Sequence, residues 1–245
     1  MTATLPARAA AHVWSAQEKS VLVRAALHTD SCGVGSPWTV EVHEQRVEIY
    51  ERFRAASWLH DGAGRDRVLA CGSALAGVAV AMRVLGWLPE TVLLGDAARP
   101  DLAACVTARA RLRPGNTDAR RFQALFDQRR HRHTVDPATL PGDVLDEIVH
   151  AGAARGVSLV PLSSFTPASR KQTLDPGLLV VTAADGRRDQ ILAGAAMQQA
   201  TLAARTRELT TAPQIGPFQF REFRQRVLRS CGLSGSPQLL LRLGT

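Results

Sequence analysis

The sequence predicts an α+β fold in which a mixed, mainly antiparallel sheet is flanked by helices and the chain is built from two similar halves. Segments with the apolar spacing of helices alternate with short strand-like runs. Two of these runs, 38–43 and 46–53, are separated by a two-residue turn, which is typical of an antiparallel hairpin. Two long helical segments start alike, with DRVLA at 66–70 and DQILA at 189–193, which indicates a weak internal repeat.

The first half is expected to span residues 1–115. Residues 17–28 space their apolar side chains as an amphipathic helix does, and 29–37 is rich in Gly, Ser, Asp and Pro, as a loop is. The clearest helix follows the hairpin and covers 65–87, with apolar residues recurring every three or four positions. Two further strands complete this half in the prediction, at 91–94 and 104–113.

The second half, residues 116–245, begins after a turn at 113–116 that contains Pro and Gly. The run GLLVVT at 177–182 is apolar almost throughout, as in a strand buried on both faces. The expected helices are 117–128, 143–155, 188–209 and 220–229, the expected strands are 157–162, 177–182 and 238–243, and the expected loops are 163–176 and 210–219.

The charge of the chain favours anionic ligands. The formal net charge is +8, and of the 30 basic residues only Lys19 and Lys171 are lysines. The arginines are scattered through both halves, which argues against a dedicated nucleic-acid surface, so a nucleic-acid partner is the least favoured hypothesis.

The cysteines and the apolar runs point to a cytoplasmic protein without a membrane partner. The four cysteines are far apart and form no C-x-x-C pair, so zinc ligation and a disulfide framework are not expected. The N-terminal residues lack the apolar core of a signal peptide. The uncharged run 68–82 is shorter than the roughly 20 residues of a membrane span.

A cationic cluster lies near the middle of the chain. Arg129, Arg130 and Arg132 fall within four positions next to a turn, and planar guanidinium groups suit the oxygens of a phosphate. A solvated, charged helix end is the alternative interpretation. His131 and His133 could form a metal pair, but side chains two positions apart on a helix point in different directions, which favours solvated side chains.

Several motifs, in order along the chain, carry a family resemblance. RAALH at 24–28 leads into a loop that ends in Pro37-Trp38 and is followed by the strand WTVEV. The later motifs are LACGSAL at 69–75, LGW at 85–87, RRHR at 129–132, APQIG at 212–216 and PQLLLRLG at 237–244. In this order they resemble the nitroreductase superfamily, and in particular its Acg-like branch, in which two nitroreductase-type halves are fused.

The resemblance implies a three-layer, pseudo-dimeric fold that binds FMN at the junction of its halves. It also implies that NAD(P)H reduces the flavin, which passes two electrons to a small-molecule acceptor such as a nitro compound or quinone, in a monomer or homodimer. The flavin would supply the redox chemistry, so no catalytic residue of the protein is expected. The cofactor-binding residues implied are Ser31, Cys32, Gly33, Ser36, Arg129, Arg130, Arg132, Ile215 and Gly216.

Three departures from the family pattern leave a second hypothesis open. Asp30, Val34 and Ser36 stand where the family has Pro, Asn and Gln. Val34 cannot form a side-chain hydrogen bond, and Asp30 brings a negative charge toward an anionic cofactor. The alternative is therefore a non-catalytic relative that binds or sequesters flavin.

Overall fold

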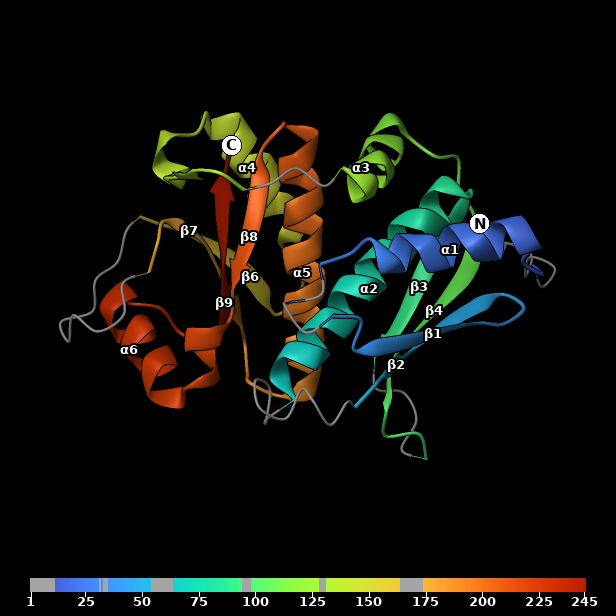
Figure 1. Cartoon of the computed structure of the whole chain (residues 1–245), viewed down its shortest axis with the longest axis horizontal. Coiled ribbons are helices and arrows are strands. Elements are labelled where there is room, and N and C mark those ends of the chain that lie inside the picture. The colour runs from blue at the N-terminus through green and yellow to red at the C-terminus, as the bar shows by residue number, and fades with distance from the viewer. Residues whose placement is uncertain are drawn as a thin grey trace, which may run out of the picture.

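The expected α+β class is confirmed by a computed structural model of the chain, which describes residues 12–30, 32, 35–53, 64–93, 98–127, 131–163 and 174–245. Two antiparallel sheets lie on either side of a central pair of long helices (Figure 1). Among the described strands every pairing is antiparallel, and the strands form two sheets rather than one mixed sheet.

The first sheet contains only strands from the first half of the chain. Its order is β1-β2-β4-β3, and the expected hairpin is present, with Trp38 opposite Glu51. Val47 and Ile49 of β2 are fully buried and anchor the sheet against the core. The elements of this half are α1 (Ala16–Leu27), β1 (Trp38–Val42), β2 (Arg46–Glu51), α2 (Arg65–Val84), β3 (Trp87–Leu93) and β4 (Leu102–Arg111).

The second sheet contains only strands from the second half. Its central strand, β9, pairs with β7 on one side and with β8 on the other, because both strands pair with Leu240 and Leu241. The elements are α3 (Asn116–Phe126), β5 (Thr134–Val135), α4 (Gly142–Gly152), β6 (Val157–Leu162), β7 (Gly177–Thr182), α5 (Arg187–Thr206), β8 (Thr210–Gln214), a short 3-10 helix (Gly216–Gln219), α6 (Arg221–Cys231) and β9 (Ser236–Gly244).

The expectation of a loop over 210–219 is wrong for its first half. Residues Thr210–Gln214 form β8, which pairs with β9 along its whole length. The run TTAPQ lacks the alternation of a strand and contains Pro213, which cannot donate to a ladder. Pro213 is tolerated because β8 pairs with β9 on one side only.

The central helices α2 and α5 cross at two glycines. A Cβ atom added at Gly72 would clash with the carbonyl oxygen of Ile191, and one added at Gly194 would clash with that of Leu69. The two contacts are related by the same shift of 122 residues (72 to 194 and 69 to 191). This shift differs by one residue from the sequence match of DRVLA with DQILA.

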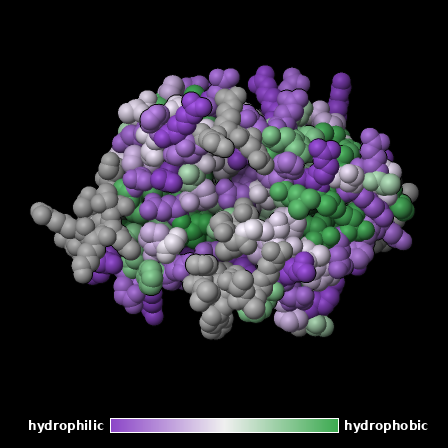
Figure 2. Space-filling model, viewed as in Figure 1, coloured by the Kyte–Doolittle hydropathy of each residue, from purple (hydrophilic) through white to green (hydrophobic). Residues whose placement is uncertain are grey.

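The smaller helices cover this central pair. α1 packs on α2, α4 packs on α5, and α3 contacts both long helices where the two halves meet. By length and composition α2 could cross a membrane, but 83% of its apolar window is buried inside the protein, as expected for a core helix. In the view of Figure 2, hydrophilic residues are spread over both halves, and hydrophobic surface gathers over the half that contains α1 and α2.

Candidate functional site

One face of α5 carries three polar residues at the junction of the two halves. Gln198, Thr201 and Arg205 are three and four positions apart, so they lie on one side of the helix. Gln198 and Thr201 are 0% and 1% exposed, and Arg205 is half-buried. We call these residues the polar face of α5. Buried polar groups in a helix of mainly small apolar residues require partners, so the face is a candidate site.

The loop that leaves α1 in the first half contacts this face directly. The backbone N–H of Asp30 donates to Oε1 of Gln198 over 3.0 Å, and Oδ1 of Asp30 accepts from the backbone N–H of Cys32 over 2.8 Å. Burial raises the pKa of the Asp30 carboxyl, and the Cys32 hydrogen bond and the charge of Arg205 offset this only in part.

Among the described residues, the amide nitrogen of Gln198 has no hydrogen-bond partner. Because Oε1 accepts from Asp30, the orientation of the amide is set, and Nε2 is buried without a hydrogen bond. An unsatisfied buried donor costs about 1–3 kcal/mol. An acceptor supplied by a ligand would remove that cost, once the packing around Gln198 opens enough to admit it.

Arg205 lies at the other end of the polar face, beside the end of α3. Its Nη1 donates to the carbonyl oxygen of Ala124 over 3.2 Å, and it forms no direct ion pair with a described residue. Burial lowers the pKa of the guanidinium, while the nearby carboxylates of Asp30 and Asp127 act in the opposite direction. The group remains a cation with unused donors.

The third contact comes from β8 in the second half. Oγ1 of Thr211 donates to Oγ1 of Thr201 over 3.3 Å. The polar face is therefore covered by the α1 loop, the end of α3 and β8. The shift of 122 residues places Ala76, Ala79 and Arg83 of α2 in the positions of Gln198, Thr201 and Arg205, so α2 lacks the two buried polar groups and keeps the arginine.

The loop residues implied by the family resemblance are only partly described. Ser31 and Gly33 lie outside the described residues, and Ser36 is half-buried. Cys32 is buried and has a positive φ of 55°, which is uncommon for a residue with a side chain. Burial and the charge of Asp30 raise the pKa of its thiol well above the ordinary value, so Cys32 is not a reactive thiolate.

Among the described residues, Arg132 forms no hydrogen bond with the polar face. Arg129 and Arg130 lie outside the described residues, and Arg132 is exposed at the end of β9, where its backbone N–H donates to the carbonyl oxygen of Thr245 over 3.0 Å. Thr210, which contacts the neighbouring His131, and Thr211, which contacts α5, are adjacent in β8. Their side chains therefore point to opposite faces of the sheet.

His131 is a packed side chain rather than the solvated one expected. Its ring nitrogens lie 3.1 Å from Oγ1 of Thr134 and 3.1 Å from Oγ1 of Thr210. A side chain at Gly244 would clash with this ring. Burial and the charge of Arg242 lower the pKa of His131, which favours the neutral form of the ring.

Ile215 and Gly216 lie at the opposite end of β8 from Thr210. Ile215 is buried and Gly216 is exposed. Ile215 follows Thr210 by five steps along the strand, which corresponds to roughly 17 Å. The structure therefore does not bring this pair together with Arg132. It places Asp30 and Cys32 near the polar face of α5. Sequence reasoning missed this face, although Gln198, Thr201 and Arg205 recur at helical spacing within the helix expected over 188–209.

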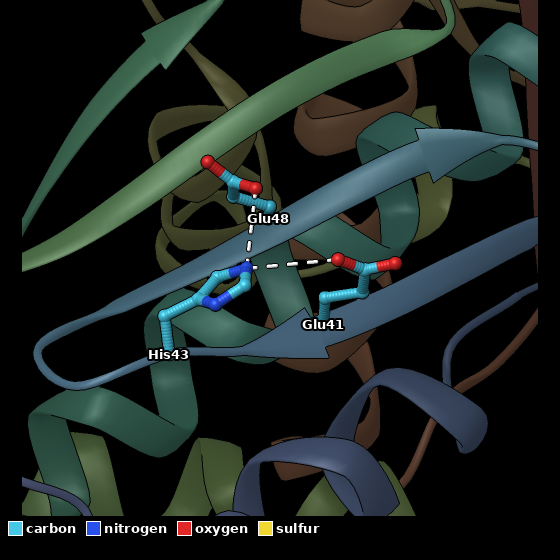
Figure 3. A group of neighbouring side chains, drawn as sticks. All are labelled: Glu41, His43 and Glu48. Atoms are coloured by element: carbon cyan, nitrogen blue, oxygen red, sulfur yellow. Dashed lines mark ion pairs between the residues drawn. The ribbon is translucent and has the colours of Figure 1, made fainter.

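Two other features are weaker candidates. Glu41, His43 and Glu48 face one another on the first hairpin (Figure 3), and Nε2 of His43 lies 3.6 and 3.2 Å from the two carboxylates. Glu48 also accepts from the Tyr50 hydroxyl over 2.6 Å and from Arg99 over 3.0 Å. These donors already use the acceptor positions that a metal would need, so we interpret the cluster as an ion-pair network.

A cavity of about 510 Å³ lies at one end of the second sheet, where β6 begins and β7 ends. It is lined by small and β-branched residues, which are Gly156, Val157, Ser158, Val181, Thr182, Ala183, Ser234 and Gly235. None of these lining residues carries an acidic, basic or thiol side chain, so the cavity has no group that points to a ligand or a reaction.

No protein-family model matches the chain, and no curated protein sequence matches it. Among solved structures, the chain is similar to a protein of Thermotoga maritima that is provisionally described as a nitroreductase. The two share 10% sequence identity over 87% of this chain and 83% of that protein, with a TM-score of 0.49.

Proposed function

We propose that this protein is a flavin-dependent oxidoreductase of nitroreductase type. In this proposal it binds one FMN at the junction of its halves, receives electrons from NAD(P)H and reduces a nitro or quinone acceptor. The proposal rests on the ordered motifs of the sequence and on one structural observation, the buried polar face of α5 with its unpaired Gln198 amide nitrogen.

The residues present fit part of a flavin nucleotide. The ring system of FMN has oxygen and nitrogen acceptors, one of which could accept from Nε2 of Gln198. Its phosphate requires charge-assisted donors, which arginine provides. When bound, the flavin would supply the two-electron chemistry, and the protein would position it and exclude water.

The two central helices differ at the positions that would bind a flavin, which supports one cofactor per chain. Gln198 and Thr201 of α5 are replaced by Ala76 and Ala79 in the corresponding positions of α2. Alanine offers no hydrogen bond to a ligand, so the α2 side of the junction lacks these two groups. The two halves share an architecture, while the proposed binding groups belong to the second half.

The colour of the untreated purified protein tests this proposal. A flavoprotein should show the two visible absorption bands of oxidised flavin and should lose them when NADH or NADPH is added without oxygen. Addition of a quinone should then restore the bands, with one equivalent of quinone consumed per flavin. A colourless protein that does not take up added FMN would refute the proposal.

A non-catalytic flavin-binding protein is the second candidate, and one observation favours it. Asp30, Val34 and Ser36 stand where the family pattern has Pro, Asn and Gln, and the Val34 side chain offers no hydrogen bond to a flavin. Such a protein would hold flavin without turnover. Retention of the visible bands, combined with no NAD(P)H oxidation in the presence of quinones, would identify it.

A further inference from the structure

We propose that α3 is a lid over the polar face of α5, held at its first turn and released at its last turn. The inference rests on the proposed function and concerns how a ligand reaches the site. Gln198 and Thr201 are almost fully buried, so a ligand meets them only after a covering segment moves. The described segments that cover the face are the α1 loop, β8 and the end of α3.

Two equivalent arginines hold α3 at its two ends. Arg83 of α2 and Arg205 of α5 are related by the same shift of 122 residues that relates the two sides of the helix crossing. Nε of Arg83 donates to Oδ1 of Asp118 in the first turn of α3 over 2.6 Å. Nη1 of Arg205 donates to the carbonyl oxygen of Ala124 in the last turn over 3.2 Å. α3 is therefore bound to both long helices.

The first turn is the stronger of the two attachments. The contact of Arg83 with Asp118 joins two full charges, whereas the contact at the other end joins a cation to an uncharged carbonyl group. Oδ2 of Asp118 also accepts from the backbone N–H of Gly115 over 2.9 Å, so the same carboxylate fixes the start of the helix. Just before this turn, the backbone N–H of Leu112 donates to the carbonyl oxygen of Gly86 over 2.9 Å.

The last turn, residues 122–126, depends on uncharged groups. Its sequence, FQALF, contains no ionisable side chain. The ring of Phe126 lies 4.7 Å from the ring of His28, between centroids, and the guanidinium carbon of Arg24 lies 5.5 Å from the centroid of Phe126. Leu125 is fully buried, so the closed form predominates and opening is transient.

The connections of α3 also differ from those of the other short helices. α4 and α6 each lead into a strand of the second sheet within five residues (152 to 157 and 231 to 236). The next described strand after α3 is the two-residue β5, which begins eight residues later (126 to 134). Among the described elements, α3 is thus tied closely to a strand at its start, by β4, and not at its end.

The other two covering segments are fixed along their length or at both ends. All five residues of β8 pair with β9. The α1 loop runs from α1 to β1, and the carbonyl oxygen of Pro37 at its end accepts from the backbone N–H of Arg52 over 2.7 Å. Release of the last turn of α3 would take the Ala124 carbonyl away from Arg205 and open that end of the polar face to solvent.

A thiol at position 124 would report this opening. Ala124 is buried, and Ala124→Cys adds one sulfur atom on the covered side of α3. Iodoacetamide labelling of the full chain, located by mass spectrometry, gives the rate at 124 beside that of Cys71, which is fully buried in α2. Each rate is divided by that of the same thiol in the urea-unfolded chain. Since local opening is more frequent than global unfolding, the thiol at 124 should react at least about 10-fold faster than Cys71.

One substitution tests the latch and a second serves as its control. Arg205→Met removes the donor to the Ala124 carbonyl, keeps most of the side-chain volume, and should raise the rate at 124 several-fold without changing that of Cys71. Arg207 lies two residues further along the chain, is exposed and pairs with Glu147. Arg207→Met changes the net charge equally and should alter neither rate.

Hydrogen exchange gives a second measurement that needs no substitution in α3. In the unmodified chain, the amides of 123–126 should exchange at a rate that low concentrations of urea do not change, as expected for local opening. The amides around Cys71 should exchange more slowly, at a rate that rises steeply with urea, because they open only when the fold unfolds.

The outcomes separate the lid from the proposed function, which the affinity of the wild-type chain for FMN tests alone. If the chain binds FMN while position 124 reacts no faster than Cys71 and the α3 amides exchange only with global unfolding, the flavin site stands and the lid is wrong. If position 124 opens as expected and FMN does not bind, α3 moves but does not serve a flavin site, and the proposed function fails. An unchanged rate at 124 in Arg205→Met would show that Arg205 does not hold the last turn closed.

Discussion

The crossing of α2 and α5 gives the sharpest prediction about the fold. Gly72→Ala and Gly194→Ala each place a methyl group against a backbone carbonyl of the other helix, which cannot move without separating the two helices. Overpacking of this kind costs typically 1–3 kcal/mol. Alanine gains back up to about 1 kcal/mol from its higher helix propensity, so the net loss should be about 1–2 kcal/mol for each variant.

Gly142→Ala is the internal control, because it is also a helical position but has nothing within 4 Å of the added atom. It should leave stability unchanged or raise it by up to about 1 kcal/mol. Urea unfolding followed by circular dichroism would give the three free energies. In a domain of this size a loss of 1–2 kcal/mol lowers Tm by roughly 2–8 °C.

The double variant provides a further check on the geometry. The two glycines meet at one crossing, so a separation forced by the first methyl group should already make room for the second, and the combined loss should be smaller than the two single losses together. Gly72→Ala and Gly194→Ala behaving like Gly142→Ala would refute the reasoning, because the helices would then not be in backbone contact.

The remaining predictions concern charge, thiols and metal. Burial alone would raise the pKa of Asp185, but the hydrogen bond and charge of Arg65 bring that pKa below its ordinary value. The ionised carboxylate therefore stabilises the fold above the pKa of the unfolded chain, and this stabilisation is lost as pH falls through the folded pKa. Asp185→Asn should lower the free energy of unfolding at pH 7 and make it fall less in acid, and an unchanged acid titration of stability would contradict this prediction. Cys32 should resist iodoacetamide at pH 7 in the native state and react after unfolding in urea, because its thiol is buried and neutral; rapid native labelling at Cys32, located by mass spectrometry, would show otherwise. Added zinc should leave Tm unchanged, because Tyr50 and Arg99 already donate to the Glu48 carboxylate of the Glu41, His43 and Glu48 cluster. A Tm that rises with zinc in the wild type and not in His43→Ala would argue for a metal site at this cluster.

Much of the fold could be predicted from local patterns. The hairpin, both long helices and the strands at 157–162 and 177–182 have clear periodicity, and the structure places them with small boundary shifts. The helix expected over 65–87 ends earlier, and the last residues of that segment, from Trp87, belong to β3. Such patterns arise because one side of each element packs against the core.

β8 and the polar face could not be predicted in the same way. β8 contains proline, has no alternation and exists because β9 offers a free side for pairing. The sequence gives no sign that Gln198, Thr201 and Arg205 are buried, because the α1 loop, the end of α3 and β8 cover them only in the folded chain. Both features depend on tertiary contacts between distant segments.

The arginine cluster stays a prediction, because Arg129 and Arg130 lie outside the described residues. Three arginines next to a turn form a conspicuous pattern, and the one that the structure describes, Arg132, is exposed beside the end of β9. Charge density in a sequence does not indicate which cations will have free donors in a buried position. Arg205 has that position, and its sequence context, AARTRE, gives little sign of it.

A titration of the purified chain with FMN, read by flavin absorbance at a protein concentration well above the dissociation constant, tests the central claim most directly. We expect saturation at one FMN per chain for the wild type and a loss of binding in Gln198→Leu, with folding verified by circular dichroism. Saturation at two equivalents, or unchanged binding in Gln198→Leu, would contradict a single flavin site on the polar face of α5.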